Sequence, residues 1–208
     1  MYASKDPWSA SGDSIAGGMT TPAPSSLEAT HRALLERFRK TMNLVGPGPI
    51  DEHFDDAASA LHGLQPTGRW VDLGSGAGFP GLVLVDRFPQ LQVDLVDSRQ
   101  KRCTFLEMVL EEARIPAERA RVLCQRVEAL PGATYDGVVS RAFAPPAVAL
   151  EHAERLLVPG GTAVLFLQNH APDCPEPQAS DPRWEVFHVE HYALGARRRK
   201  AVSLHFQR

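Results

Sequence analysis

The chain has 208 residues, which is enough for one well-packed domain with a small extension. Its hydrophobic fraction of 43% and charged fraction of 23% are typical of a soluble globular protein, and no stretch is long and apolar enough to span a membrane. The net charge of −3 excludes a generally basic nucleic-acid binder, so any such binding must depend on a local patch.

The sequence also bears on the compartment. No basic region followed by an apolar core stands at the N-terminus, so we expect no secretory signal. The three cysteines, Cys103, Cys124 and Cys174, form no close pair, which indicates reduced thiols. Both observations predict a cytoplasmic protein.

The N-terminal part divides into a tail and a helical extension. Residues 1–25 are rich in Ser, Gly, Pro, Thr and Ala and show no apolar periodicity, which predicts a disordered tail. Ser25 and Glu28 have the spacing of a capping box and predict the start of a helix. A second helix is expected from Asp51 to about His62, so that residues 26–66 form a small helical extension.

From residue 67 to residue 208 the pattern is that of one α/β domain. The predicted strands are Arg69–Leu73, Val93–Val96, Arg121–Cys124, Tyr135–Ser140 and Thr162–Leu167, and the predicted helices are Gly81–Arg87, Ser98–Ala113 and Ala147–Leu157. After a proline-rich loop over residues 171–182, the runs Trp184–Val189 and Ala201–Phe206 predict an antiparallel pair. The expected fold is therefore a Rossmann-like, mostly parallel sheet of about seven strands with an antiparallel last pair and helices on both faces.

The most informative motif follows the first strand and reads Asp72-Leu-Gly-Ser-Gly-Ala-Gly-Phe-Pro-Gly81. The order of strand, glycine turn and helix places backbone N–H groups around a small ligand. Gly74, Gly76 and Gly78 allow the main chain to turn sharply and approach that ligand closely. Pro80 can begin the helix, because the first helical N–H has no partner to lose.

Two cofactors compete for this loop. Read from Gly76, the spacing matches the G-x-G-x-x-G pattern of dinucleotide-binding proteins, which would make the chain an NAD-dependent oxidoreductase. Asp72 argues otherwise, because a carboxylate there would repel a pyrophosphate and attract the ammonium and sulfonium of S-adenosylmethionine. The electrostatics favour S-adenosylmethionine. A strand-to-helix turn without a ligand is the remaining alternative.

A second acid, Asp97, ends the second predicted strand. An acid about 20 residues past the glycine loop is placed to accept both ribose hydroxyls of a nucleoside. Because this works for either cofactor, Asp97 does not discriminate between them. Asp97 or Ser98 is also a suitable N-cap for the next helix.

From residue 69 onward the chain resembles a class I S-adenosylmethionine-dependent methyltransferase. More narrowly, it resembles the bacterial glucose-inhibited division protein B family, which methylates guanine N7 in small-subunit (16S) ribosomal RNA. The matching residues are the glycine loop, Asp97-Ser98 followed by Lys101-Arg102, Arg126-Val127-Glu128, Ser140-Arg141-Ala142 and Pro159-Gly160-Gly161, with weaker echoes at Asn43-Leu44 and His53-x-x-Asp56.

The resemblance implies roles for individual residues. Gly74 and Phe79 would line the cofactor pocket, Val127 and Glu128 would flank the adenine, and Arg141 would close the methionine side near the substrate as the catalytic candidate. The cofactor-binding set expected from motif and resemblance together is Asp72, Gly74, Gly76, Gly78, Phe79, Asp97, Ser98, Val127, Glu128 and Arg141. The implied cofactor is S-adenosylmethionine, and the implied partner is 16S ribosomal RNA or a precursor of the small ribosomal subunit.

The chain lacks the sequence motifs of two other classes of nucleic-acid methyltransferase, which is consistent with methylation at guanine N7. Guanine N7 has a free lone pair and no proton, so its methylation needs alignment and water exclusion but no general base. Methyltransferases of exocyclic amines carry Asp/Asn-Pro-Pro-aromatic after the fourth strand, whereas this chain has Ser140 to Ala147 there, without that motif. No cysteine follows that strand directly, which argues against a pyrimidine C5 mechanism.

Contact with RNA would fall to two basic clusters. Arg99, Lys101 and Arg102 stand in the first turn of a predicted helix, where they oppose the macrodipole and have no acid three or four residues downstream. They would bind phosphate or form a solvated surface turn. Arg198 and Arg199, at the entry to the last strand, are the second candidate, and protection of an edge strand by charge is the alternative. Phe143 could stack on a flipped guanine or belong to the core.

Departures from the family pattern keep other functions open. The family has Leu-Lys-Gly after the fifth strand, where this chain has Leu167-Gln168-Asn169. A divergent methyltransferase of a small molecule or protein and a non-catalytic binding module are therefore alternatives. His188, His191 and Cys174 lack a further close ligand, so we expect no metal. The protein is expected to be a monomer.

Overall fold

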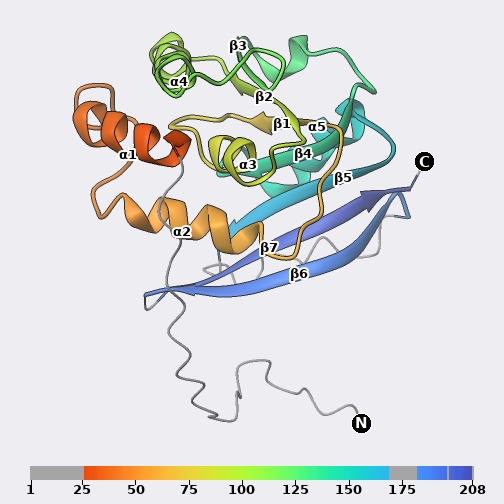
Figure 1. Ribbon diagram of the computed structural model, residues 1–208. Helices are drawn as coiled ribbons and strands as arrows, with labels where there is room; N and C mark the ends of the chain where they lie inside the picture. The colour runs from red at the N-terminus through yellow and green to blue at the C-terminus, as the bar shows by residue number, and fades with distance from the viewer. Residues whose placement is uncertain (1–25, 169–181, 196, 208) are drawn as a thin grey trace.

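Seven strands form a single sheet in the order β3-β2-β1-β4-β5-β7-β6 in a computed structural model that describes residues 26–168, 182–195 and 197–207 (Figure 1). The predicted tail over residues 1–25, the capping residue Ser25 and residues 171–181 of the predicted loop lie outside the described residues.

The helices and strands follow the predicted alternation. The strands are β1 (Arg69–Leu73), β2 (Gln92–Asp97), β3 (Ala120–Cys124), β4 (Tyr135–Arg141), β5 (Leu157–Gln168), β6 (Trp184–Leu194) and β7 (Arg197–Phe206). The helices are α1 (Ser26–Phe38), α2 (Asp51–Ala60), α3 (Gly81–Arg87), α4 (Gln100–Glu112) and α5 (Pro146–Leu156), with a 3₁₀ turn, η1 (Val127–Ala129). Strands β3, β2, β1, β4 and β5 are parallel, and β7 runs antiparallel to both β5 and β6. The prediction of a mostly parallel sheet with an antiparallel last pair is confirmed.

Element boundaries differ from the prediction in a few places. Pro80 occupies the N-cap of α3 instead of its first turn, and its carbonyl accepts the N–H of Leu84 at 3.0 Å. Helix α4 begins at Gln100 with Arg99 at its N-cap, so the prediction that Asp97 or Ser98 caps it is wrong. The Asp97 carboxylate instead accepts hydrogen bonds from the N–H groups of Gly76 in the glycine loop and of Arg99.

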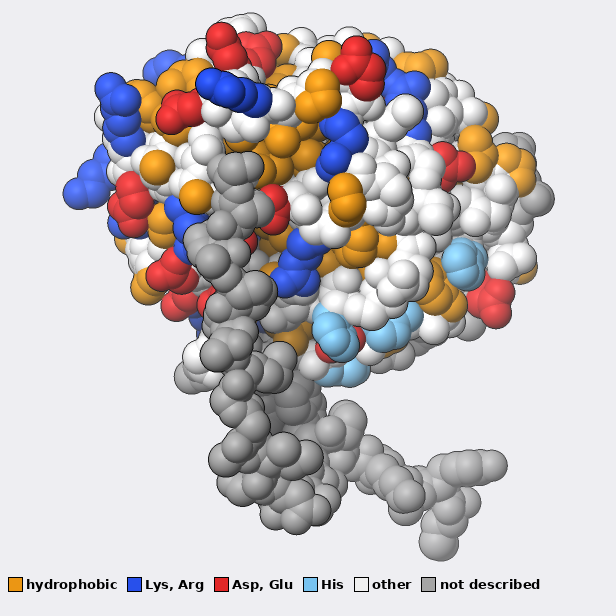
Figure 2. All heavy atoms as spheres, viewed as in Figure 1, with side chains coloured by type: hydrophobic (Ala, Val, Ile, Leu, Met, Phe, Trp, Pro, Cys, Tyr) orange, Lys and Arg blue, Asp and Glu red, His pale blue; other side chains and the backbone are white. Residues whose placement is uncertain are grey.

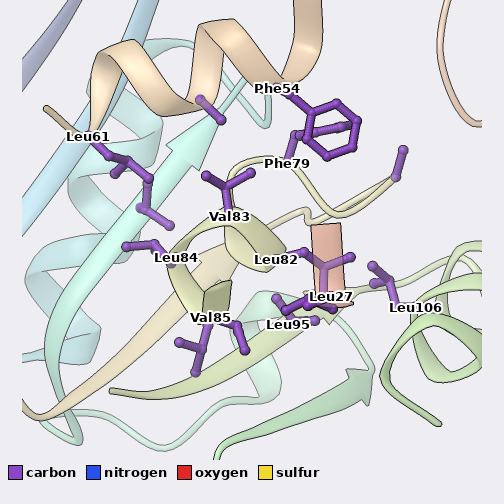
Figure 3. Close-up of a cluster of buried hydrophobic side chains, with 14 of the residues drawn as sticks. Leu27, Phe54, Leu61, Phe79, Leu82, Val83, Leu84, Val85, Leu95 and Leu106 are labelled. Carbon is purple, nitrogen blue, oxygen red and sulfur yellow. The ribbon is translucent and has the colours of Figure 1, made fainter. Parts of the chain in front are cut away.

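Two hydrophobic layers lie on the two faces of the sheet. Side chains of α1, α2, α3 and α4 share one cluster, and Figure 3 shows Leu27, Phe54 and Leu106 converging on the α3 residues Leu82–Val85. The other cluster joins α5 to β1, β4, β5 and β7. Most residues of the central strands β1, β2 and β4 are buried, as is expected for parallel strands covered on both faces by crossover helices. The prediction of helices on both faces is confirmed.

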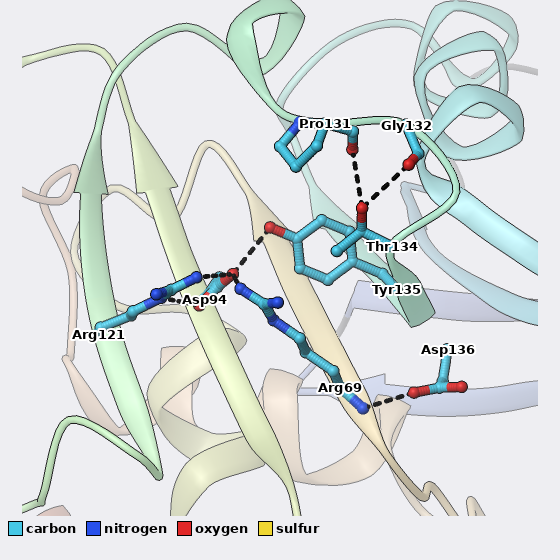
Figure 4. Close-up of polar contacts among 8 residues, drawn as sticks. All are labelled: Arg69, Asp94, Arg121, Pro131, Gly132, Thr134, Tyr135 and Asp136. Carbon is cyan, nitrogen blue, oxygen red and sulfur yellow. Dashed lines mark hydrogen bonds and ion pairs between the residues drawn. The ribbon is translucent and has the colours of Figure 1, made fainter.

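Asp94 on β2 links four strands through side chains near the amino-terminal ends of β1, β3 and β4 (Figure 4). Arg69 and Arg121 each donate to its carboxylate at 2.7 Å, and the Tyr135 hydroxyl donates at 2.8 Å. Burial raises the pKa of Asp94, but these hydrogen bonds outweigh burial and hold its pKa below the usual value. A buried charge with three donors is therefore a structural link between β1, β2, β3 and β4.

Replacing Asp94 should destabilise the fold strongly. Asp94→Ala removes the acceptor for a buried hydroxyl and two guanidinium groups, so we expect a loss of about 3 kcal/mol in the free energy of unfolding, measured by denaturant titration. Glu154→Ala is the control, because it breaks a more exposed ion pair with Arg183 and should cost at most about 1 kcal/mol. Equal losses in the two variants would contradict the role given to Asp94.

Candidate cofactor and substrate cleft

The glycine loop crosses the carboxyl ends of β1 and β2, which are adjacent in the sheet. Gly74, Gly76 and Gly78 have φ angles of +68°, +57° and +94°, which L side chains rarely adopt. The loop is closed by backbone hydrogen bonds from Ser75 N–H to the Val96 carbonyl at 2.9 Å and from Gly78 N–H to the Ser75 carbonyl at 2.7 Å. The predicted sharp turn is thus present and is attached directly to the end of β2.

Asp97 holds this loop from the tip of β2. Its Oδ2 accepts the Gly76 N–H at 3.0 Å and the Arg102 guanidinium at 3.3 Å, and its Oδ1 accepts the Arg99 N–H at 2.9 Å. The residue is 4% exposed. Its predicted contact with ribose hydroxyls stays a prediction, and the geometry adds a second role, which is to fix the glycine loop against β2.

Asp72 lies beneath the loop and is fully buried. Its Oδ2 accepts the N–H of Gly81 at the start of α3, at 3.0 Å, whereas its Oδ1 has no hydrogen-bond partner among the described residues. Burial raises the pKa of Asp72 from 3.8 to about 7. A buried carboxylate oxygen without a donor is an energetically costly arrangement that a cationic ligand would relieve.

Two hollows meet at the glycine loop. The first, of about 360 Å³, is lined by Asp97, Ser98, Val127 and Glu128 together with Phe143. The second, of about 330 Å³, is lined by Phe79 and Arg141 together with residues of the N-terminal extension and of β6 and β7. Gly74, Arg102 and Ala142 line both, so the hollows form the two halves of one cleft. We call them the nucleoside half and the substrate half.

The predicted cofactor residues divide between these halves. The nucleoside half is lined by Asp97, Ser98, Val127 and Glu128. The substrate half is lined by Phe79 and Arg141, and both halves are lined by Gly74. Gly76 lines the substrate half, whereas Gly78 and Asp72 line neither and lie behind the loop. The structure therefore gathers most of the set around one cleft, and the binding roles stay predictions.

Arg141 extends from the end of β4 into the substrate half. Its Nη1 donates to Asp56 Oδ2 on α2 at 3.1 Å, and its guanidinium lies 4.9 Å from the centre of the Phe79 ring. The Arg141 and Asp56 side chains are 18% and 14% exposed, so solvent screens this ion pair only weakly. Arg141 is thus held in a defined place at the mouth of the loop.

Two histidines of the N-terminal extension, His31 and His53, contact the loop, and His53 is one of the residues that resemble the family pattern more weakly. His31 on α1 is buried, and its Nε2 lies 2.7 Å from the Ala77 carbonyl. Burial lowers the pKa of His31 to about 4, so its ring is neutral and Nε2 donates this hydrogen bond. The ring of His53 on α2 lies 5.5 Å from that of Phe79, between centroids, at a tilt of 32°, and His53 lines the substrate half. A polar residue on the apolar face of α1 was the signal that could have identified His31.

The predicted basic residues are brought together more closely than their sequence positions suggest. Arg102 and Arg199, from the two separate clusters, both line the substrate half with Arg141, and Arg99 lines the nucleoside half. Lys101 is exposed and lines neither, and the Arg198 side chain lies outside the described atoms. Figure 2 shows Lys and Arg interspersed with Asp and Glu on one face of the molecule. Arginines therefore line the cleft from segments that are far apart in the sequence.

Phe143 packs partly against the core, and its ring lies 5.6 Å from that of His152. It also lines the nucleoside half, so a role in binding stays a prediction. Among the described residues no group of three His, Cys, Asp or Glu side chains could hold a metal ion, and Cys174 lies outside them. No helix in the described ranges is long and apolar enough to cross a membrane.

Comparison with known proteins decides the family. A model of the rRNA small subunit methyltransferase G family matches residues 28–200. The chain belongs to this family. The ribosomal RNA small subunit methyltransferase G of Rhodospirillum rubrum is 39% identical over 181 residues, which cover 82% of this chain and 86% of that protein. That of Paracoccus denitrificans is 37% identical over 143 residues, covering 66% of this chain and 73% of the relative.

Solved structures agree on the fold. The crystal structure of magnesium protoporphyrin IX methyltransferase from Synechocystis PCC 6803 with bound SAM has a TM-score of 0.57 at 13% identity and covers 90% of this chain and 100% of that chain. Such a likeness at low identity shows a class I methyltransferase fold. The expectation drawn from the glycine loop and the Ser140-Arg141-Ala142 motif is confirmed, and the oxidoreductase alternative is wrong.

As a member of the rRNA small subunit methyltransferase G family, the protein is an S-adenosylmethionine-dependent methyltransferase, and its cleft fits that cofactor. A cation above the loop would favour the ionised form of the buried Asp72 carboxyl, whose Oδ1 has no hydrogen-bond partner in the described part of the chain, whereas a pyrophosphate would not. At Gly74 a Cβ would approach a Phe143 ring carbon to 2.8 Å, so the loop and Phe143 pack closely only because Gly74 has no side chain. The buried carboxyl beneath the loop therefore suits a positively charged nucleoside that carries no phosphates.

The buried Asp72 predicts an unusual pH dependence of stability. Because its pKa is raised to about 7 in the folded protein, the folded state binds the proton more tightly than the unfolded state. The wild type should therefore lose about 2–3 kcal/mol of stability relative to Asp72→Asn as the pH rises from 5 to 8. Denaturant titrations of the cofactor-free protein at the two pH values measure this change.

Asp94→Asn is the matched control for this experiment. The pKa of Asp94 is lowered, so its carboxylate is ionised at both pH values and its stability difference from wild type should stay constant. A constant difference for Asp72→Asn as well would show that Asp72 is already ionised at pH 5.

Proposed function

We propose that the protein methylates guanine N7 in 16S ribosomal RNA, using S-adenosylmethionine as the methyl donor. The observation that supports this proposal is the continuous cleft. Its nucleoside half contains Asp97 and meets the substrate half at Gly74. The substrate half is lined by Arg102, Arg141 and Arg199. A cofactor in one half would present its methyl group toward a base in the other half. Membership of an rRNA methyltransferase family supports the same substrate.

The nucleoside half would hold the cofactor through contacts of distinct kinds. Asp97 would accept from the ribose hydroxyls while its hydrogen bond to Gly76 keeps the loop in place. Val127, which is buried, and Glu128, which is exposed, would flank the adenine from η1. The orphaned Asp72 oxygen would favour the positive end of the cofactor. The loop closed over α3 would keep the donor in one orientation.

The substrate half suits an acceptor that carries no proton. S-adenosylmethionine supplies the electrophilic methyl group when bound, and guanine N7 attacks with its own lone pair. Among the described lining residues, the carboxylate of Asp56 already accepts from Tyr192 and Arg141, and burial lowers the pKa of His53. A strong general base is thus missing from this part of the cleft, and Arg141 would orient the acceptor and shield it from water.

The basic residues would bind the RNA backbone around this cleft. Arg102 and Arg199 would contact phosphates next to the target nucleotide, and Arg99 would extend that contact. Lys101 and Arg198, which neighbour these arginines in the sequence, are the further candidates for phosphate contact. Because the chain as a whole is acidic, binding would be restricted to RNA that places phosphates at these positions. We infer that the protein acts as a monomer in the cytoplasm, on 16S RNA or a precursor of the small subunit.

A divergent methyltransferase acting on a small molecule or a protein is the second candidate. It is favoured by Gln168-Asn169, which replaces the lysine that the family pattern places after β5. It is also favoured by the pairing of Arg141 with Asp56, which reduces the positive charge in the substrate half.

The deciding experiment maps N7-methylguanine in ribosomal RNA from cells with and without this gene. We expect one 16S position to lose its methyl group on deletion and to regain it when the wild-type gene is restored. A fully methylated 16S RNA in the deletion strain would reject RNA as the substrate and favour the second candidate.

Arg141→Ala tests the substrate half directly. Because this guanidinium lies at the mouth of the glycine loop, we expect methyl transfer to 16S RNA to fall at least tenfold while the protein stays folded. Purified variants are compared by transfer of radiolabelled methyl groups. Arg183→Ala removes an arginine of a more exposed ion pair elsewhere and serves as the control. Unchanged activity in Arg141→Ala would remove Arg141 from the site.

A further inference from the structure

We propose that Tyr192 and Asp56 are positioning residues for methyl transfer, which hold the Arg141 guanidinium in place at the substrate half of the cleft. This inference rests on the proposed function and adds two residues to its site. Neither residue belongs to the parallel core of the sheet, since Asp56 comes from α2 and Tyr192 from β6.

The three side chains form a continuous chain of hydrogen bonds. The Tyr192 hydroxyl donates to Asp56 Oδ1 at 2.8 Å, and Arg141 donates to Asp56 Oδ2 at 3.1 Å. One carboxylate thus bridges two donors, with one oxygen committed to each. Fixing the carboxylate by the tyrosine also fixes the direction from which it attracts the arginine.

Arg141 is restrained on two sides. Asp56 accepts from Nη1, and the Phe79 ring lies under the guanidinium at 4.9 Å. A guanidinium has five N–H donors, so the others are available to a ligand in the cleft that Arg141 lines. Without the carboxylate the long arginine side chain would sample several rotamers, and part of the binding energy would be spent on ordering it.

The network acts through Arg141 and not as an acid or base. Burial and the Asp56 charge raise the pKa of Tyr192 well above its usual value, so its hydroxyl stays a donor at every physiological pH. Asp56 serves as the acceptor in both hydrogen bonds, one through each carboxylate oxygen. A further ion pair, between Glu52 on α2 and Arg197 on β7, joins α2 to the strand that pairs with β6.

The experiment compares two tyrosine-to-phenylalanine variants. Tyr192→Phe removes the hydroxyl that donates to Asp56, and Tyr135→Phe removes an equivalent hydroxyl that donates to Asp94 at the same distance of 2.8 Å, away from the cleft. Both lose one hydrogen bond to a carboxylate, so both should lose some stability. Only Tyr192→Phe should lower kcat/KM for methyl transfer to 16S RNA, by about tenfold, or about 1.4 kcal/mol.

A double-mutant cycle shows whether the effect passes through Arg141. In an Arg141→Ala background Tyr192→Phe should cause no further loss of methyl transfer, because the group that it positions is gone. A tenfold loss in that background, or equal activity of Tyr192→Phe and Tyr135→Phe in the wild-type background, would overturn the proposal.

A readout without RNA separates this inference from the proposed function. The NMR order parameter of the Arg141 Nε–H group should fall in Tyr192→Phe and Asp56→Asn and stay at the wild-type value in Tyr135→Phe. An unchanged order parameter in all three variants would overturn the positioning role. If the wild type left 16S RNA unmethylated while the order parameter fell as expected, the proposed substrate would be wrong and the positioning of Arg141 would stand.

Discussion

The geometry of the cleft depends on two buried carboxylates that hold one glycine loop. Asp72 is the penultimate residue of β1 and Asp97 the last residue of the neighbouring β2, and they accept the N–H groups of Gly81 and Gly76, respectively. Because the strands are adjacent in the sheet, the loop is fixed at both of these points to the rigid core. The nucleoside half and the substrate half both take their shape from this loop, so any shift of either strand end would change them together.

The elements that were predictable from the sequence have local signals. Each of these patterns can be recognised from residues that are close together in the sequence. They are the glycine loop, the acid at the end of β2 and the alternation of strands and helices. The contacts of Asp56 are not local: Arg141 lies 85 residues away and Tyr192 136 residues away. Nothing in the pattern around Tyr192, which sits in an alternating strand, distinguishes a cleft residue from a core residue. Contacts of this kind become visible only when the sheet order is known.

Charge in the cleft is balanced pair by pair. Arg102 is matched by Asp97, and Arg141 is matched by Asp56. Arg199 lines the same half, and its buried Nε has no hydrogen-bond partner among the described atoms. These two pairings reduce the positive charge of Arg102 and Arg141, and Arg199 adds a further positive charge to the substrate half. The cleft can therefore attract an anion locally although the chain has a net charge of −3.

Strand β7 lies between β5 and β6, although β6 precedes it in the chain. During translation β6 leaves the ribosome first and has no neighbour in the sheet until residues 197–206 have emerged. Tyr192, on β6, can therefore meet Asp56 only after the last strand has been inserted. All the residues that line the nucleoside half lie between Gly74 and Phe143, whereas the substrate half also takes residues from β6 and β7. In the order of synthesis, the substrate half is therefore the later of the two to receive its last residues.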